Sequence, residues 1–199
     1  MVIDDNGKGL STTGLGHGDA QHVSDLNPYR HGQEIFACNE DNPANNLRDA
    51  TTSKIYYRMT DTNDAGRAIA GNFYNTIPGS VCYGAHDTPV STVIADHVNV
   101  NTNGLGMNFR IYWDGDLQEE SFDNITVSKP GAGTLTTFSG AYSNNSTKAT
   151  PCYQGDIFGD WREEVILRTG DNNLRIYTTT TPTEWRNYSL WYDHQYRNA

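Results

Sequence analysis

The sequence predicts an all-β fold, and three observations support this prediction. Short runs rich in Val, Ile, Tyr and Thr recur between Gly, Asn and Pro residues. The composition favours strands and turns, with 22 Thr, 20 Asn and 19 Gly but four Lys. No segment keeps a 3.6-residue hydrophobic period for long. A helical bundle and a coiled coil are therefore excluded.

Eight runs are expected to form strands. Apolar residues are combined with β-branched or aromatic residues in EIFACNE, SKIYYRMT and GSVCYGA, and apolar and polar residues alternate in MNFRIYWDG and GTLTTFSG. A continuous apolar run lies in EEVILRT. Residues that favour β-strands are frequent in LRIYTTTT and YSLWYD. In chain order the eight runs are residues 34–40, 53–60, 79–85, 107–115, 133–140, 163–169, 174–181 and 188–193.

Internal repetition indicates which all-β fold this is. Asp25 and Gly32 align with Asn72 and Gly79 at an offset of 47 residues, and a third copy places Asp156 where Asp25 stands. Each unit consists of a strand, a polar loop, a second strand and a further hairpin. Units of about 45 residues with two hairpins have the size of a propeller blade. We therefore expect about three β-propeller blades, with repeats that start near residues 17, 64 and 148.

Three blades do not close a ring, so residues 1–199 are expected to be an incomplete β-propeller domain. Residues 85–106 are interpreted as an insertion between repeats, and residues 128–148 as a polar excursion. Long loops on a β scaffold are where binding function usually lies.

The charge limits the classes of partner. The formal net charge is −10, so the chain lacks the basic face that binding to nucleic acid requires. No apolar run approaches the roughly 18 residues that span a bilayer, which excludes a membrane protein. An excess of Asp with Asn nearby indicates either a solvated acidic surface or oxygen ligands for Ca²⁺.

Three cysteines, Cys38, Cys82 and Cys152, cannot all pair with one another, and none has the CxxC spacing of a zinc site. Each lies in an apolar, strand-like run, which favours buried free thiols. The first residues, MVIDDNGKG, lack the basic and apolar regions of a signal peptide.

Three cationic or titratable residues take similar places in the repeats. His17 and Lys148 each lie eight residues before the aligned aspartate of their repeat, and Arg67 lies near the same point of the middle copy. Equivalent positions in propeller blades face one end of the central channel, so we expect His17, Arg67 and Lys148 to line one cavity that binds an anion. The alternatives are an exposed loop lysine and a salt bridge between Arg67 and Asp64.

His17, Asp19 and Glu40 form a candidate metal site. His17 and Asp19 are two residues apart, which places both on one face of a strand, and Glu40 closes the same repeat. Mixed nitrogen and oxygen ligands are unusual for Ca²⁺. The alternative is a hydrogen-bonded structural histidine.

A second candidate calcium site lies in the loop DIFGDWREE, where Asp156, Asp160 and Glu164 are spaced oxygen donors. The corresponding loop of the first copy ends in Glu34 and matches a calcium loop less closely. The middle copy has Asn72 and no acidic residue at its end, so we expect no metal there.

Five segments that together run through nearly the whole chain closely resemble the rhamnogalacturonan lyases of polysaccharide lyase family 11. They are residues 14–36, 64–72, 107–117, 147–169 and 174–186. The resemblance implies an eight-bladed, calcium-containing β-propeller in a bacterial enzyme that is secreted or held at the cell envelope. Such enzymes cleave the rhamnose–galacturonate backbone of pectin by β-elimination. The family also implies a further active-site His upstream and a Tyr downstream of this chain. Residues 1–199 are then expected to be an incomplete β-propeller catalytic domain, inactive when made alone.

The resemblance implies a role for each candidate residue. Ca²⁺ held by His17, Asp19 and Glu40, together with Arg67, would neutralise the galacturonate carboxylate. Lys148 would be the general base or acid, and it acts as a base only when its amine is neutral. The expected partner is an acidic plant polysaccharide, rhamnogalacturonan I, and the full-length protein is expected to be a monomer.

Two other functions were weighed. A noncatalytic, calcium-stabilised propeller that binds acidic glycans would keep the Asp loops but would need neither Lys148 nor Arg67. A purely structural propeller segment of a surface protein is the third interpretation.

Overall fold

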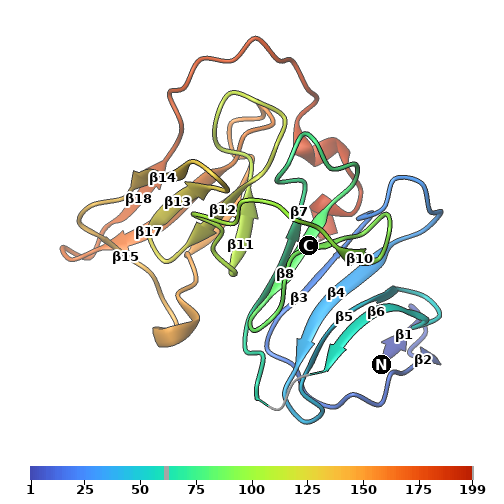
Figure 1. Cartoon of the computed structure of the whole chain (residues 1–199). Coiled ribbons are helices and arrows are strands. Elements are labelled where there is room, and N and C mark those ends of the chain that lie inside the picture. Colours follow the sequence, from blue (N-terminus) through green and yellow to red (C-terminus); the bar gives the residue numbers. More distant parts are fainter. Residues whose placement is uncertain (61–62, 199) are drawn as a thin grey trace. The chain divides into compact units, whose positions relative to one another are not determined.

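The computed structural model describes residues 1–60 and 63–198. It confirms the all-β prediction, because apart from three short 3₁₀ helices the regular structure of these residues is antiparallel β-sheet (Figure 1). The chain divides into two compact units, Met1–Asn101 and Thr102–Ala199. Each unit holds two four-stranded sheets.

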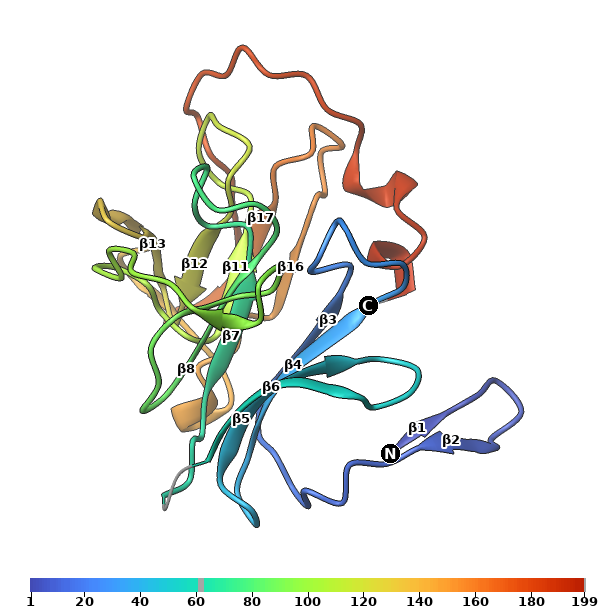
Figure 2. The ribbon, with the colours of Figure 1, turned by 45° about the vertical axis from the view of Figure 1, so that its right-hand side comes forward.

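The two sheets of the first unit have the strand orders β3-β4-β5-β6 and β10-β9-β8-β7. Their strands are β3 (Gln21–Ser24), β4 (Glu34–Asn39), β5 (Ala44–Asp49), β6 (Ile55–Thr60), β7 (Ala68–Gly71), β8 (Val81–Gly84), β9 (Val90–Ser91) and β10 (Asp96–His97). A hairpin of β1 (Val2–Ile3) and β2 (Gly9–Ser11) stands apart from both sheets (Figure 2). The Ser11 hydroxyl donates a 2.9 Å hydrogen bond to the Thr51 carbonyl, which ties this hairpin to the turn after β5.

The first sheet of the second unit has the order β11-β12-β13-β14, and in the other sheet β17 pairs with β15, β16 and β18. β15 and β16 pair with successive stretches of β17, and a 3₁₀ helix lies between them. The strands are β11 (Phe109–Ile111), β12 (Glu120–Asp123), β13 (Thr126–Lys129), β14 (Gly133–Thr137), β15 (Ala141–Tyr142), β16 (Tyr153–Gly155), β17 (Glu164–Thr169) and β18 (Leu174–Tyr177), and the helices are η1 (Ser146–Lys148), η2 (Leu190–Tyr192) and η3 (Tyr196–Asn198).

Each unit has its own apolar core, built from alternating strand residues of its two sheets. In the first unit, Phe36 and Cys38 of β4 face the core together with Ala68 and Ala70 of β7. In the second unit, Phe122 of β12 lies in the core with residues of the other sheet such as Val165 and Leu167. The period of two along each strand is what directs these side chains to one face.

In three of the four sheets described, a buried glutamate begins the strand that follows a polar loop, namely β4, β12 or β17. In each case its Oε2 atom accepts hydrogen bonds from two successive backbone N–H groups of the preceding loop. Glu34 accepts from Leu26 and Asn27 at 3.1 and 3.0 Å, Glu120 from Trp113 and Asp114 at 2.9 and 3.2 Å, and Glu164 from Ile157 and Phe158 at 2.8 and 3.1 Å. These loop-closing glutamates give the loop N–H groups a charged acceptor, and the N–H groups of Leu26 and Ile157 also donate to the carbonyls of Ser24 and Gly155.

A further buried carboxylate, Glu163, links three parts of the second unit. It accepts hydrogen bonds from the backbone N–H of Tyr112 at 3.0 Å, the side-chain amide of Gln154 at 3.2 Å and the hydroxyl of Tyr196 at 2.9 Å. Burial raises the pKa of Glu163 to about 7, and these hydrogen bonds oppose the shift.

The alignment of repeats agrees with the strands, but the count differs. Asp25, Asn72 and Asp156 directly follow β3, β7 and β16, as the alignment requires. The described residues form four four-stranded sheets, whereas the alignment found about three repeats, because β11 begins a sheet that the alignment did not count. Residues 85–106, which were interpreted as an insertion, contain β9 and β10, and these strands complete a sheet. Residues 128–148, which were interpreted as a polar excursion, contain β14 and β15.

Two local predictions were wrong. Residues 188–193 form a 3₁₀ turn at Leu190–Tyr192 rather than a strand, because Ser189 caps that turn by accepting the N–H of Trp191. Cys38 and Cys82 are buried free thiols as expected, whereas Cys152 is exposed, since it lies in the segment just before β16.

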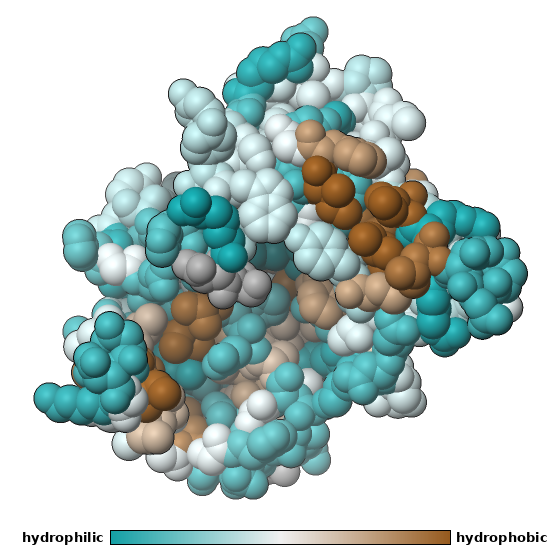
Figure 3. Space-filling view, turned by 180° about the vertical axis from the view of Figure 1, so that it is seen from behind, coloured by the Kyte–Doolittle hydropathy of each residue, from teal (hydrophilic) through white to brown (hydrophobic). Residues whose placement is uncertain are grey.

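The surface is mostly hydrophilic but carries apolar patches (Figure 3). Leu174 and Ile176 of β18 are among the exposed apolar side chains. Among the described residues, no helix is both long and apolar enough to cross a membrane.

Replacing Glu34 by Ala is predicted to destabilise the first unit. It removes a charged acceptor from the N–H groups of Leu26 and Asn27 and leaves Arg30, whose guanidinium lies 3.2 Å from Glu34 Oε1, without this carboxylate. We expect a loss of about 3 kcal/mol or more in the free energy of unfolding, measured in urea. Glu184→Ala, at an exposed position, is the control. An equal, small effect of both substitutions would contradict the role of Glu34.

The raised pKa of Glu163 predicts how stability varies with pH. The unfolded side chain loses its proton near the ordinary value of 4.5 and the folded one near 7, so between these values the unfolded state binds fewer protons. The contribution of Glu163 to stability therefore falls as pH rises through this window. Relative to wild type, Glu163→Gln should gain roughly 2–4 kcal/mol between about pH 5 and pH 8 in urea unfolding. A difference that stays constant with pH would refute this.

Candidate functional site

The candidate site is built where residues 17–20 run alongside the end of β4. The pairing of β3 with β4 ends at Gln21 and Ala37, but backbone hydrogen bonds continue beyond it. The N–H of Cys38 donates to the carbonyl of Ala20 at 3.1 Å, and the N–H of Glu40 donates to the carbonyl of His17 at 2.8 Å. His17 is thereby fixed beside Glu40, although both lie outside the strands.

Gly18 allows this close approach of two backbones. A Cβ atom at position 18 would lie 2.1 Å from the carbonyl oxygen of Cys38. The backbone N–H of His17 also donates to Asp41 Oδ2 at 2.8 Å, which holds the segment from the other side. The position between His17 and Asp19 therefore requires glycine.

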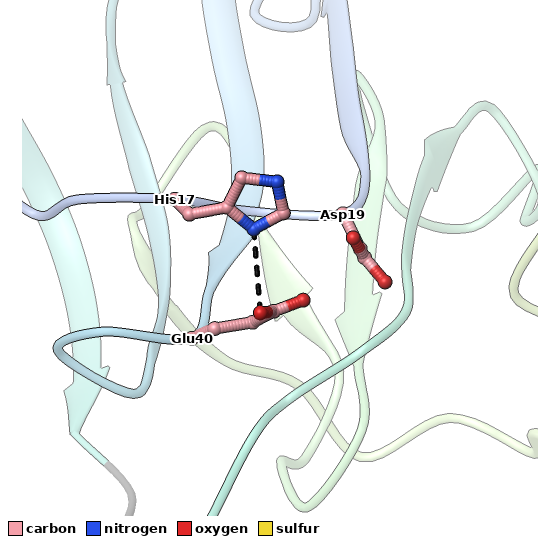
Figure 4. Close-up of side chains that lie close together, drawn as sticks. All are labelled: His17, Asp19 and Glu40. Carbon is pink, nitrogen blue, oxygen red and sulfur yellow. Dashed lines mark ion pairs between the residues drawn. The ribbon is translucent and has the colours of Figure 1, made fainter.

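The structure brings His17, Asp19 and Glu40 together (Figure 4). His17 Nδ1 lies 3.3 Å from Glu40 Oε2, and one ligand atom from each of the three lies within 4.8 Å of the others. Two oxygen ligands at 2.3–2.6 Å from one Ca²⁺ can be up to about 5 Å apart, so the three side chains fit around one cation. His17 and Asp19 are exposed, so a ligand in solution can reach them.

Arg67 lies at the same end of the first unit as this cluster. It directly precedes β7, and its carbonyl accepts the N–H of Ala85 at 3.2 Å, which extends the pairing of β7 with β8. His22 Nε2 of β3 lies 2.9 Å from the carbonyl of Ala68, so β3 and β7 begin side by side. His17 and Arg67 therefore both precede the starts of two strands that lie side by side.

Lys148 lies in the second unit, on the segment that connects β15 to β16. It ends η1, which is flanked by Asn145 and Ala149, both with left-handed backbone conformations. The side-chain amide of Asn108, directly before β11, donates to the carbonyl of Lys148 at 2.9 Å. The lysine is half-buried. Its convergence with His17 and Arg67 on one cavity stays a prediction.

The side chains of the predicted calcium loop at 156–164 are largely engaged with the protein. Asp156 Oδ2 accepts hydrogen bonds from the Ser189 hydroxyl at 2.7 Å and the backbone N–H of Leu190 at 2.9 Å. Asp160 pairs with Arg162 at 2.8 Å, and Glu164 closes the loop. Asp156 Oδ1 is buried and accepts no hydrogen bond from the described residues. That atom remains free to bind a cation, and calcium in this loop stays a prediction.

Among the described residues, two groups of three metal-ligating side chains have ligand atoms within 4.8 Å of one another. One is His17, Asp19 and Glu40. The other is Asp114, Asp116 and Glu120, which the sequence analysis did not single out. The spacing DGDLQEE was a usable signal, because it ends in the glutamate that begins a strand, as DIFGDWREE does.

The chain matches, over residues 1–199, the family model described as rhamnogalacturonan lyase family 11, C-terminal domain. The chain belongs to this family. It is 43% identical over 208 residues to rhamnogalacturonan endolyase YesW of Bacillus subtilis (strain 168), a match that covers 99% of this chain and 33% of YesW. It is 40% identical over 225 residues to rhamnogalacturonan exolyase YesX of the same organism, covering 99% of this chain and 36% of YesX. The family 11 chain thus spans about a third of the length of these relatives.

Solved structures agree with this assignment. The crystal structure of rhamnogalacturonan lyase YesW matches the family 11 chain with a TM-score of 0.91 at 42% identity, covering 98% of this chain and 34% of that one. The rhamnogalacturonan lyase PL11 of Bacillus licheniformis matches with a TM-score of 0.89 at 42% identity and the same coverage.

Gly18→Ala is predicted to disturb the His17 cluster of this family 11 chain. The added methyl group must push the His17–Asp19 segment away from Cys38, and overpacking of this kind costs about 1–3 kcal/mol. Urea unfolding should show that loss. Gly9→Ala is the matched control, because an added Cβ there would have its nearest neighbour at 3.7 Å. Unchanged stability of Gly18→Ala would argue against the close approach.

Proposed function

We propose that the protein carrying this chain cleaves the rhamnose–galacturonate backbone of rhamnogalacturonan I by β-elimination. The observation that carries this proposal is the match along the whole chain to an endolyase and an exolyase that both act on rhamnogalacturonan. The cluster of His17, Asp19 and Glu40, with Arg67 at the same end of the first unit, supplies groups suited to an acidic sugar.

We also propose that the four sheets are blades of a β-propeller, and that this propeller has eight blades. Four successive four-stranded antiparallel sheets support the proposal, since a blade is a four-stranded sheet. The exposed Leu174 and Ile176 on β18 are apolar surface of the kind that a neighbouring element covers.

The reaction sets three chemical tasks. A base removes the C5 proton of galacturonate, the electron pair forms a C4–C5 double bond, and the C4–O bond breaks. The leaving oxygen then takes up a proton. Because the C5–H bond lies next to a carboxylate, the negative charge of that group must be offset before the proton becomes acidic enough to leave.

Charge neutralisation is assigned to the first unit. His17, Asp19 and Glu40 would hold a Ca²⁺ ion, and the bound ion would supply a Lewis acid for the substrate carboxylate. Arg67 would pair with the same carboxylate, which suits its planar guanidinium. Gly18 keeps His17 and Asp19 against the end of β4, so the cluster is positioned before substrate binds.

Proton transfer is assigned to Lys148. As a neutral amine it would take the C5 proton, and as an ammonium it would give a proton to the leaving oxygen. Its backbone is anchored by Asn108 and by the left-handed residues on either side, so the side chain projects from a fixed turn.

A secreted or cell-envelope location in a bacterium is part of this proposal. The substrate is a polymer of the plant cell wall, and the relatives described above come from Bacillus. The protein is proposed to act as a monomer on this polysaccharide.

Substituting Lys148 by Ala is predicted to lower kcat by about 10²–10⁴-fold. The assay incubates the full-length protein that carries this chain with rhamnogalacturonan I. It follows the ultraviolet absorbance of the unsaturated uronate, with and without chelator. Lys8→Ala is the matched control, because Lys8 is exposed and lies on the β1–β2 hairpin. Chelation should also abolish most of the activity.

Two results would overturn the proposal. If wild type gives no absorbance with calcium present but still binds the polymer, the protein is a noncatalytic binder of acidic glycans. If Lys148→Ala is as active as Lys8→Ala, the base is a different residue.

A further inference from the structure

A group of three carboxylates lies in the second unit, in the loop after β11 and at the start of β12. It is distinct from the His17 cluster, which belongs to the first unit. The ligand atoms of Asp114, Asp116 and Glu120 lie within 4.8 Å of one another. Spaced carboxylates in a loop that ends in a glutamate are typical Ca²⁺ ligands. The question is therefore which cation balances their charge.

The ammonium group of Lys129 lies among these three carboxylates. Its Nζ atom is 2.6 Å from Asp114 Oδ2, 2.7 Å from Asp116 Oδ2 and 3.1 Å from Glu120 Oε1. A lysine ammonium has three N–H donors, and here each donor has its own carboxylate. Lys129 is the last residue of β13, next to Ser128, which pairs with Ser121 of β12, so the sheet itself brings the lysine opposite Glu120.

The other oxygen of each carboxylate is used by the loop backbone. Glu120 Oε2 accepts the N–H groups of Trp113 and Asp114. Asp114 Oδ1 accepts the N–H of Asp116 at 2.9 Å, and Asp116 Oδ1 accepts the N–H of Gln118 at 2.9 Å. Each carboxylate therefore has one oxygen that shapes the loop and one that faces the lysine.

A divalent ion does not fit this loop while Lys129 is in place. Ca²⁺ would need to lie 2.3–2.6 Å from the same three oxygens, which is the position that Nζ takes. Two cations cannot share that space. We propose that Lys129 is the resident cation of the loop at residues 114–120 and takes the place of a divalent metal ion there.

The other loop-closing glutamates also meet a donor from their own chain. Glu34 Oε1 pairs with Arg30 at 3.2 Å, and Glu164 Oε1 accepts the hydroxyl of Thr178 at 2.9 Å. A side chain of the protein can therefore complete such a loop. In the 114–120 loop that side chain carries a full positive charge and contacts three carboxylates.

The first test counts bound calcium. The protein and its Asp116→Asn variant are equilibrated with calcium, and the ions bound per chain are measured by elemental analysis. Asp5→Asn, at an exposed position, controls for the loss of one carboxylate. The proposal expects the same number for Asp116→Asn and wild type. One ion fewer in Asp116→Asn alone would overturn it, because a metal ion would then be the resident cation.

The second test removes the lysine. Lys129→Met keeps the length of the side chain but not its charge, and Lys8→Met controls for the charge. We expect Lys129→Met to melt lower than wild type in chelator, to bind one additional calcium ion, and to show a larger rise in Tm when calcium is added. A folded Lys129→Met variant with wild-type Tm and no additional ion would overturn the proposal. Since three unpaired carboxylates can prevent folding, the calcium count on Asp116→Asn decides on its own.

Discussion

The burial of a glutamate carboxylate at the start of a strand is the interaction on which this fold depends. In three of the four sheets described, the chain leaves β3, β11 or β16, makes a loop rich in polar backbone groups, and returns as β4, β12 or β17. In that loop Glu34, Glu120 or Glu164 accepts two successive backbone N–H groups, and buried N–H groups are costly when their acceptors are lost. The carboxylate also fixes the residue at which the returning strand begins. The strand's period of two then directs Phe36 or Phe122 into the core.

The two glutamates at the ends of β4 have different roles, one structural and one in the candidate site. Glu34 begins the strand and holds the loop, whereas Glu40 follows its last residue and lies beside His17. Six strand residues at about 3.4 Å each place the two ends nearly 20 Å apart. One end of the sheet is therefore closed by internal hydrogen bonds, and the other presents exposed ligands. The acidic residues that seemed alike in composition serve two distinct purposes.

The sequence predicted those parts of the molecule that depend on short spacings. The His17–Gly18–Asp19 spacing places two side chains of the cluster close together, and the backbone hydrogen bond between Glu40 and His17 brings the third beside them. The repeat alignment also located the residues that follow β3, β7 and β16. It missed the sheet that begins at Phe109, since it matched Asp25, Asn72 and Asp156 rather than the loop-closing glutamates. The contact of Lys129 with the loop at 114–120 depends on the pairing of β12 with β13, which spacing alone does not reveal.

The break between β15 and β16 has a consequence for how this chain can diverge. β15 pairs with Arg168 and Thr169 of β17, and β16 pairs with Glu164, Val165 and Ile166. Residues 143–152 lie between the two strands, so insertions or deletions there leave both registers intact. The position of Lys148 relative to the sheet can thus change through the length of this segment alone, while the pairing of β17 and the core stay the same.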